Sequence, residues 1–143
     1  MYLKQLYIFI LLIAQIALSQ EPYHVSFGRK DGLPSLNIYH SLQDKNGYQW
    51  FASDLGVLKY DGYSFSLLST EDGLADNENF SCFQDSKGRI WFLAYNGKIS
   101  FLLDNKIFNE SNFTLLKTNQ KNGYISRISE NTRGEIIIIY SNG

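Results

Sequence analysis

The pattern of apolar and polar positions predicts short strands along most of the chain. In residues 23–27, apolar positions alternate with His24 and Ser26, which indicates a half-buried strand that ends at Gly28. Four further strand candidates follow at tight spacing, at residues 37–43, 48–53, 57–60 and 63–69. Turn-forming residues separate these four runs, and Asp61-Gly62 between the last two predicts a two-residue type I′ turn. The segment is therefore predicted to form a four-stranded antiparallel meander.

This pattern repeats. Residues 43–51, which include Asp44, Gly47 and Trp50, return forty-one positions later as residues 84–92. The second unit predicts strands at 78–84, 89–95 and 98–103 and a fourth near 106–117, with a loop inserted at 109–112. A weaker third copy predicts strands at 124–130 and 135–140 and has Ile137 at the tryptophan position. A repeated unit of about forty residues that contains four short strands is typical of a β-propeller blade.

The fold class predicted from the repeats is therefore all-β, with about two and a half blades of an incomplete propeller. We expect repeat 1 at residues 31–71, repeat 2 at 72–117 and a partial repeat 3 at 118–143. Trp50 and Trp91 would lie on the second strand of each blade and fill the space between blades. Because the third unit stops between strands, the sequence is interpreted as an N-terminal fragment, and residues 20–30 as a strand that closes the ring.

Residues 1–19 have the features of a secretory signal peptide. Lys4 supplies a positive charge, residues 6–18 form an apolar run, and Ala17-Leu18-Ser19 fits a small-residue cleavage site. The apolar run is short for a bilayer, so a cleaved peptide is favoured over an uncleaved anchor, which remains the alternative.

Composition supports the all-β prediction and excludes some functions. Aromatic residues make up 15% of the chain, a content that favours pleated sheets, and 44% of residues are hydrophobic, enough for a core. The formal net charge is −1 with no basic run, which argues against nucleic-acid binding by this segment. Cys82 is the single cysteine, so an internal disulfide and a cysteine-based zinc site are excluded.

The candidate chemistry is sparse. Asp44 and Asp85 suggest acid/base chemistry or a calcium loop, but their recurrence at turn starts favours the capping of backbone N–H groups. His24 and His40 lack metal-ligand spacing. We therefore predict no catalytic residue, metal site or cofactor, and name no ligand-binding residue. The residues assigned a structural role in the repeat are Gly32, Asp44, Gly47, Trp50, Gly73, Asp85, Gly88 and Trp91.

The repeat resembles the two-component regulator propeller repeat. The resemblance rests on Asp31-Gly32-Leu33-Pro34-Ser35, on Gln43-Asp44 with Gly47 and Trp50-Phe51, and on the stretch from Gly56 to Phe65 with its Tyr60-Asp61-Gly62. In that family the repeats form the periplasmic sensor region of histidine kinases, mostly from Bacteroidetes-type bacteria. The resemblance is clear in two repeats and weak in the third.

The resemblance implies a function for the whole protein. The chain would be the N-terminal periplasmic, ligand-sensing segment of a transmembrane, inner-membrane sensor histidine kinase, a homodimer whose ligand in many relatives is an oligosaccharide. Two alternatives remain: the same propeller coupled to a helix-turn-helix regulator or nucleotide cyclase, and an extracytoplasmic carbohydrate-binding propeller protein without signalling output. Any spanning helix would lie beyond residue 143.

Overall fold

The computed structural model describes residues 2, 4–5, 24–117 and 124–141. From residue 38 onward, the described part of the chain forms three antiparallel sheets. The predicted signal peptide lies almost wholly outside these residues. The first sheet contains β1 (Ile38–Gln43), β2 (Gln49–Ser53), β3 (Val57–Tyr60) and β4 (Phe65–Leu68). The second contains β5 (Asn79–Gln84), β6 (Ile90–Ala94), β7 (Ile99–Leu103) and β8 (Lys106–Phe108). The third pairs β9 (Tyr124–Glu130) with β10 (Ile136–Ser141). Both four-stranded sheets are meanders in chain order, as the pattern predicts.

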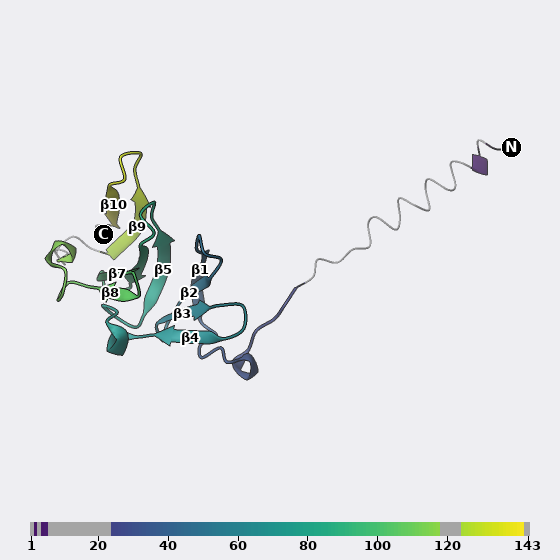
Figure 1. The fold of residues 1–143 in the computed structure, drawn as a ribbon, viewed down its shortest axis with the longest axis horizontal. Coiled ribbons are helices and arrows are strands. Elements are labelled where there is room, and N and C mark those ends of the chain that lie inside the picture. The colour runs from purple at the N-terminus through teal and green to yellow at the C-terminus, as the bar shows by residue number, and fades with distance from the viewer. Residues whose placement is uncertain (1, 3, 6–23, 118–123, 142–143) are drawn as a thin grey trace.

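The first strands of the three sheets come together. Figure 1 shows β1 beside β5, with the β9–β10 hairpin next to β5. Side chains of β1, β5 and β9 line a common cavity of about 330 Å³. Three sheets whose first strands converge have the arrangement that consecutive propeller blades adopt around an axis. The structure is thus all-β and propeller-like.

Two hydrophobic clusters hold the sheets together. Trp50 on β2 is 2% exposed and packs with Ile90 and Phe92 of β6 between the first and second sheets. Trp91 on β6 packs with Ile125 and Ile128 of β9 between the second and third. Since alternate residues of a strand point to opposite faces, β6 supplies both clusters, and all five of its residues are buried.

The segment before the first sheet differs from its prediction. Residues 24–28 form no strand, and Val25 and Phe27 are 55% and 40% exposed. The Phe27 ring instead packs against Tyr60 and Phe65 of the first sheet, with ring centroids 5.0 and 5.4 Å away. An alternating run forms a strand only where a partner strand is available, and the described residues offer none here. Closure of a ring by this segment stays a prediction.

The predicted type I′ turn at Asp61-Gly62 is wrong. Tyr60 pairs with Phe65, so the hairpin between β3 and β4 has a four-residue loop. The Asp61 carboxylate accepts hydrogen bonds from the backbone N–H groups of Tyr63 and Ser64, both at 2.8 Å, and stabilises the longer loop.

The second sheet has the two-residue turn that was expected in the first. Leu103 pairs with Lys106, and Asp104 and Asn105 between them have φ values of 48° and 60°. Two left-handed residues are what a type I′ turn requires. The strand that follows is shorter than the predicted 106–117, because the Asn109 side chain accepts the Ser111 N–H at 2.8 Å in a local turn. The loop predicted at 109–112 is therefore present.

Candidate functional site

The repeated turn after β1 is built around one carboxylate. Asp44 Oδ1 accepts hydrogen bonds from the backbone N–H groups of Asn46 at 2.8 Å and Tyr48 at 3.0 Å. Asp44 Oδ2 accepts from the indole Nε1 of Trp50 at 2.8 Å. The aspartate that starts the turn and the tryptophan that separates two sheets are thus one hydrogen-bonded unit.

The turn after β5 repeats this geometry and adds a cation. Asp85 Oδ1 accepts from the N–H groups of Lys87 and Arg89, both at 3.0 Å, and Oδ2 accepts from Trp91 Nε1 at 2.8 Å. The Arg89 guanidinium also donates to Oδ2 at 2.5 Å. Burial alone would raise the pKa of Asp85, but the hydrogen bonds from Trp91 and Arg89 outweigh it and hold the pKa below its ordinary value.

In the third turn, both the aspartate and the tryptophan are replaced. Asn131 replaces the aspartate, and its Oδ1 accepts from the N–H groups of Arg133 at 2.9 Å and Glu135 at 3.0 Å. Ile137 stands at the tryptophan position and has no N–H group to donate from its side chain. Once the indole donor is absent, a neutral amide oxygen is sufficient for the turn.

The two carboxylates of these turns are occupied by internal hydrogen bonds. The Asp44 and Asp85 side chains are buried, and both oxygens of each carboxylate already accept hydrogen bonds. Each carboxylate thus fixes its own turn and the neighbouring indole. The described residues also contain no group of three or more side chains of the metal-ligating types.

The glycines of the repeat occupy left-handed positions. Gly47 and Gly88 have φ values of 88° and 82° within the Asp44 and Asp85 turns. Gly32 and Gly73, with φ values of 82° and 106°, end the 3₁₀ turns η1 (Arg29–Asp31) and η2 (Thr70–Asp72). The Asp-Gly-Leu sequence of the first two repeats therefore lies at the end of a short 3₁₀ turn.

A hydrogen bond between neighbouring sheets recurs beside these turns. The backbone N–H of Lys45 donates to Gln84 Oε1 of the second sheet at 2.9 Å. One repeat later the N–H of Ser86 donates to Glu130 Oε2 of the third sheet at 2.7 Å. Gln84 and Glu130 occupy equivalent positions, directly before Asp85 and Asn131. We call this contact the turn clamp.

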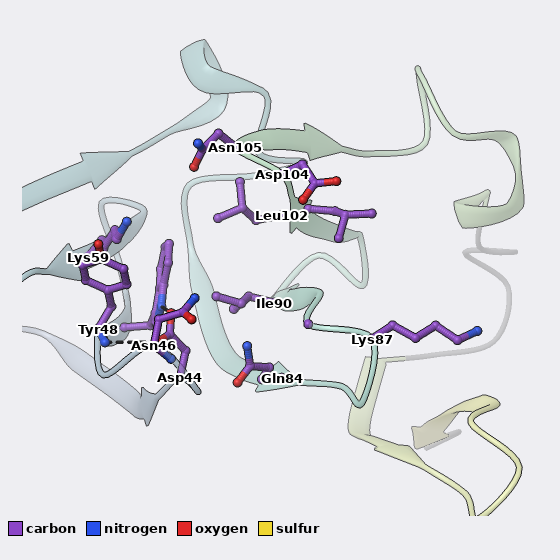
Figure 2. Close-up of a pocket in the computed structure, with 13 residues that line it drawn as sticks. Asp44, Asn46, Tyr48, Lys59, Gln84, Lys87, Ile90, Leu102, Asp104 and Asn105 are labelled. Atoms are coloured by element: carbon purple, nitrogen blue, oxygen red, sulfur yellow. Dashed lines mark hydrogen bonds between the residues drawn. The ribbon is translucent and has the colours of Figure 1, made fainter.

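A polar cleft of about 380 Å³ lies between the first and second sheets on the side of these turns. Figure 2 shows Tyr48, Asn46 and Lys59 on one side of the cleft, facing Ile90 and Leu102 on the other. The Lys59 ammonium lies 3.8 Å from the centroid of the Tyr48 ring. Asp44 accepts hydrogen bonds from its own turn and from Trp50, and Lys59 lies over an aromatic ring. Lys87 and Asp104 also line the cleft, which therefore offers a polar and charged surface.

His40 and Cys82 lie together in the cavity between the first strands. His40 Nδ1 is 3.3 Å from Cys82 Sγ. Burial raises the pKa of the Cys82 thiol to about 12, so the side chain stays protonated and unreactive. His24, in contrast, is exposed on the segment before the first sheet.

The ends of the sheets opposite the Asp44 and Asp85 turns carry a feature that the sequence did not predict. The register of each first strand skips one residue, and the skipped residues, Tyr39, Phe80 and Ser126, occupy equivalent positions in the three sheets. A β-bulge re-aims the side chain that it carries. The Tyr39 and Phe80 rings both contact Tyr95, with ring centroids 5.4 and 5.2 Å away. The signal available in the sequence was the aromatic residue at matching repeat positions.

Comparison with solved structures finds a protein with a similar fold. The structure is similar to the extracellular domain of a putative hybrid two-component system from B. thetaiotaomicron, with a TM-score of 0.60 and 20% sequence identity. The match covers 78% of this chain and 16% of that one, so the chain spans about a sixth of the similar structure. At this identity the likeness shows a shared fold.

The sequence comparisons add little about function. An uncharacterized protein, ycf91, from Porphyra purpurea is 27% identical over 113 residues, which cover 73% of this chain and 90% of that protein. No family model matches the chain. Among the described residues, no helix has the length and apolar character needed to cross a membrane.

Proposed function

We propose that this chain is the extracytoplasmic, ligand-sensing propeller segment of a transmembrane sensor histidine kinase. The observation that carries the proposal is the stack of repeated sheets joined by Trp50 and Trp91, in a fold shared with the extracellular domain of a two-component system. The apolar run at residues 6–18, if it is a signal peptide, would direct the chain out of the cytoplasm. The spanning helix and the kinase domain that such a protein requires beyond these residues are part of the proposal.

The segment would act by binding and not by catalysis. Loops at one end of the stacked sheets would contact the ligand, and a difference in ligand affinity between two arrangements of a homodimer would change autophosphorylation across the inner membrane. The buried carboxylates of the repeat hold the sheets in place in both arrangements. An oligosaccharide is the ligand class that the sequence resemblance implies.

The location can be tested by fusing alkaline phosphatase, which is active only outside the cytoplasm, after Gly143. We expect high phosphatase activity in a Gram-negative host and its loss when residues 1–19 are deleted. A matched fusion to green fluorescent protein, exported by the same route, should stay dark. A fluorescent fusion with an inactive phosphatase would contradict the proposed location.

The output can be tested separately. The coding sequence after Gly143 should contain an apolar run of about twenty residues and then a histidine kinase phosphoacceptor motif. A helix-turn-helix or cyclase domain there would favour the first alternative output. A stop after further repeats, with no apolar run, would favour a carbohydrate-binding propeller protein without signalling output.

A further inference from the structure

An aromatic cavity lies at the bulged ends of the first strands, on the side opposite the Asp44 and Asp85 turns. Phe80, Tyr95 and Tyr124 line it together with Ile125, and its volume is about 320 Å³. Tyr39 packs edge-on against Tyr95, with an angle of 81° between the rings. We call Tyr39, Phe80, Tyr95 and Tyr124 the aromatic box. Its rings come from all three sheets.

The rings of the aromatic box are accessible and are held at angles to one another. Tyr39, Tyr95 and Tyr124 are 44%, 45% and 71% exposed. Phe80 and Tyr95 are inclined by 54°. Rings inclined in this way surround a volume instead of forming one flat platform, so they can present several π faces to a single compact group.

Two acidic residues lie close to Tyr39 of the aromatic box. The Tyr95 N–H donates to the carbonyl oxygen of Glu78 at 3.0 Å, so the backbones of these two residues are adjacent. Asp54 follows Ser53, which pairs with Ile38 next to Tyr39, and its carboxylate accepts a hydrogen bond from Asn37 Nδ2 at 2.8 Å. Desolvation, followed by the negative charges of Glu78 and Asp54, raises the pKa of the Tyr39 hydroxyl. The Tyr39 ring of the aromatic box therefore lies in a negative electrostatic environment.

The basic side chain nearest in sequence to Tyr95 does not cancel this field. Lys98 Nζ pairs with Glu110 at 3.2 Å. Asp76 accepts hydrogen bonds from the Asn96 side chain and from the Glu78 N–H, and so adds a third carboxylate at the same ends of the sheets. Rings with an electron-rich face inside a negative environment attract cations.

We propose that the aromatic box binds an organic cation that carries a quaternary or methylated ammonium group. Such a group has few or no N–H donors and is weakly hydrated, so it can leave water for ring faces without needing a hydrogen-bond acceptor for each hydrogen. Glu78 and Asp54 supply the long-range attraction, and the rings supply the contact. The role of this binding in the cell rests on the proposed sensor function. The binding itself does not, because it can be measured without any signalling output.

The test compares choline with 3,3-dimethylbutan-1-ol, a neutral molecule of nearly the same shape, by calorimetric titration of the intact protein. We expect choline to bind at least about tenfold more tightly, since only choline carries the charge that the rings and carboxylates attract. Equal affinity would show an apolar pocket without cation recognition and would overturn the proposal. Absence of choline binding would overturn it as well, and would leave the proposed location and output untouched.

Variants assign the binding to the aromatic box. Tyr95→Leu should weaken choline binding about tenfold or more, while Tyr95→Phe, which keeps the ring, should retain it within about threefold. Glu78→Gln should weaken binding severalfold and reduce its dependence on salt. Tyr63→Leu is the matched control, because Tyr63 is 96% exposed on the loop between β3 and β4 and should leave binding unchanged.

Two results would count against the assignment even if choline binds. One is full retention of affinity in a folded Tyr95→Leu protein, with folding checked by circular dichroism. The other is displacement of choline by a neutral oligosaccharide such as maltohexaose, which would make the aromatic box the sugar site. If Tyr95→Leu does not fold, the comparison of Glu78→Gln with Tyr95→Phe decides the question.

Discussion

Asp44 and Asp85 occupy the same place in two repeats but differ in how many groups donate to them. Among the described residues, Trp50 is the single donor to Asp44 Oδ2, whereas Asp85 Oδ2 receives hydrogen bonds from both Trp91 and Arg89. Removal of the Trp50 indole N–H therefore leaves Asp44 Oδ2 without a hydrogen-bond donor. Removal of the Trp91 indole N–H leaves Asp85 Oδ2 with the Arg89 donor. A buried polar atom that loses its partner costs more than a hydrogen bond that is replaced.

This difference predicts unequal effects of the same substitution. Trp50→Phe should lower the free energy of unfolding of the intact protein by about 1–2 kcal/mol more than Trp91→Phe. Both variants lose a similar volume of side chain, so each serves as the control for the other. Urea denaturation measures the two values. An equal loss, or a larger loss for Trp91→Phe, would show that the indole hydrogen bond to Asp44 has little effect on stability.

The lowered pKa of Asp85 predicts a dependence of stability on pH. A carboxyl whose folded-state pKa lies below its unfolded value stabilises the fold above the unfolded pKa, and this contribution disappears as the pH falls through the folded value. Stability of the intact protein should therefore decrease as the pH falls below about 4. Asp85→Asn should lose part of this acid dependence in thermal melts between pH 6 and pH 3. An unchanged slope would argue against the contribution of Asp85.

At the scale of elements, the turn between β2 and β3 depends on one glycine. Gly56 has a φ of 139°, and a Cβ added there would overlap the carbonyl oxygen of Leu68 on β4. Neither the conformation nor the space can accommodate a side chain. In contrast, Gly47 has a φ of 88° but no atom within 4 Å of its Cβ position.

Gly56→Ala should therefore destabilise the intact protein by about 3 kcal/mol or more, because both backbone strain and overlap contribute. Gly47→Ala, the matched control, should cost about 1–2 kcal/mol from the left-handed conformation alone. Thermal or urea unfolding of the two variants measures the difference. Equal costs would mean that the first sheet relaxes around the new methyl group.

The elements also show which parts of the fold can be predicted from sequence. The recurrence of Asp44 and Trp50 as Asp85 and Trp91 was sufficient to predict two meanders, because every repeat must satisfy the same local hydrogen bonds. The bulges at Tyr39 and Phe80 were not predicted, because each lies at the second residue of its strand and shifts the alternation of only the one residue before it. The aromatic box depends on these bulges and on contacts between sheets, so it was not predicted either.

The hydrogen bond of the turn clamp has the same donor-to-acceptor direction between each pair of neighbouring sheets. In each described pair the earlier turn donates a backbone N–H to the side chain that precedes the next turn, as Lys45 does to Gln84 and Ser86 to Glu130. Gln43 occupies the same position in the first sheet, where its side chain donates to the carbonyl oxygen of Gly47 at 3.4 Å. In a closed ring, the turn of the last blade would donate to Gln43.

At the scale of the whole molecule, the two outermost faces of the stack both carry apolar side chains. On the third sheet Ile137 and Ile139 are 44% and 45% exposed. On the first sheet the outer face carries Phe51 and Phe65, with ring centroids 6.2 Å apart, and Phe27 packs against Phe65. Both faces are apolar, as expected for blades that pack against further blades.

The most direct test of the propeller is a structure of the intact protein by electron cryomicroscopy. We predict a closed ring in which the first sheet packs against the last blade through Phe51 and Phe65, and in which Gln43 accepts the N–H of the last blade's turn. A map in which the first sheet packs against no other blade, or in which the sheets form an open stack, would contradict the account.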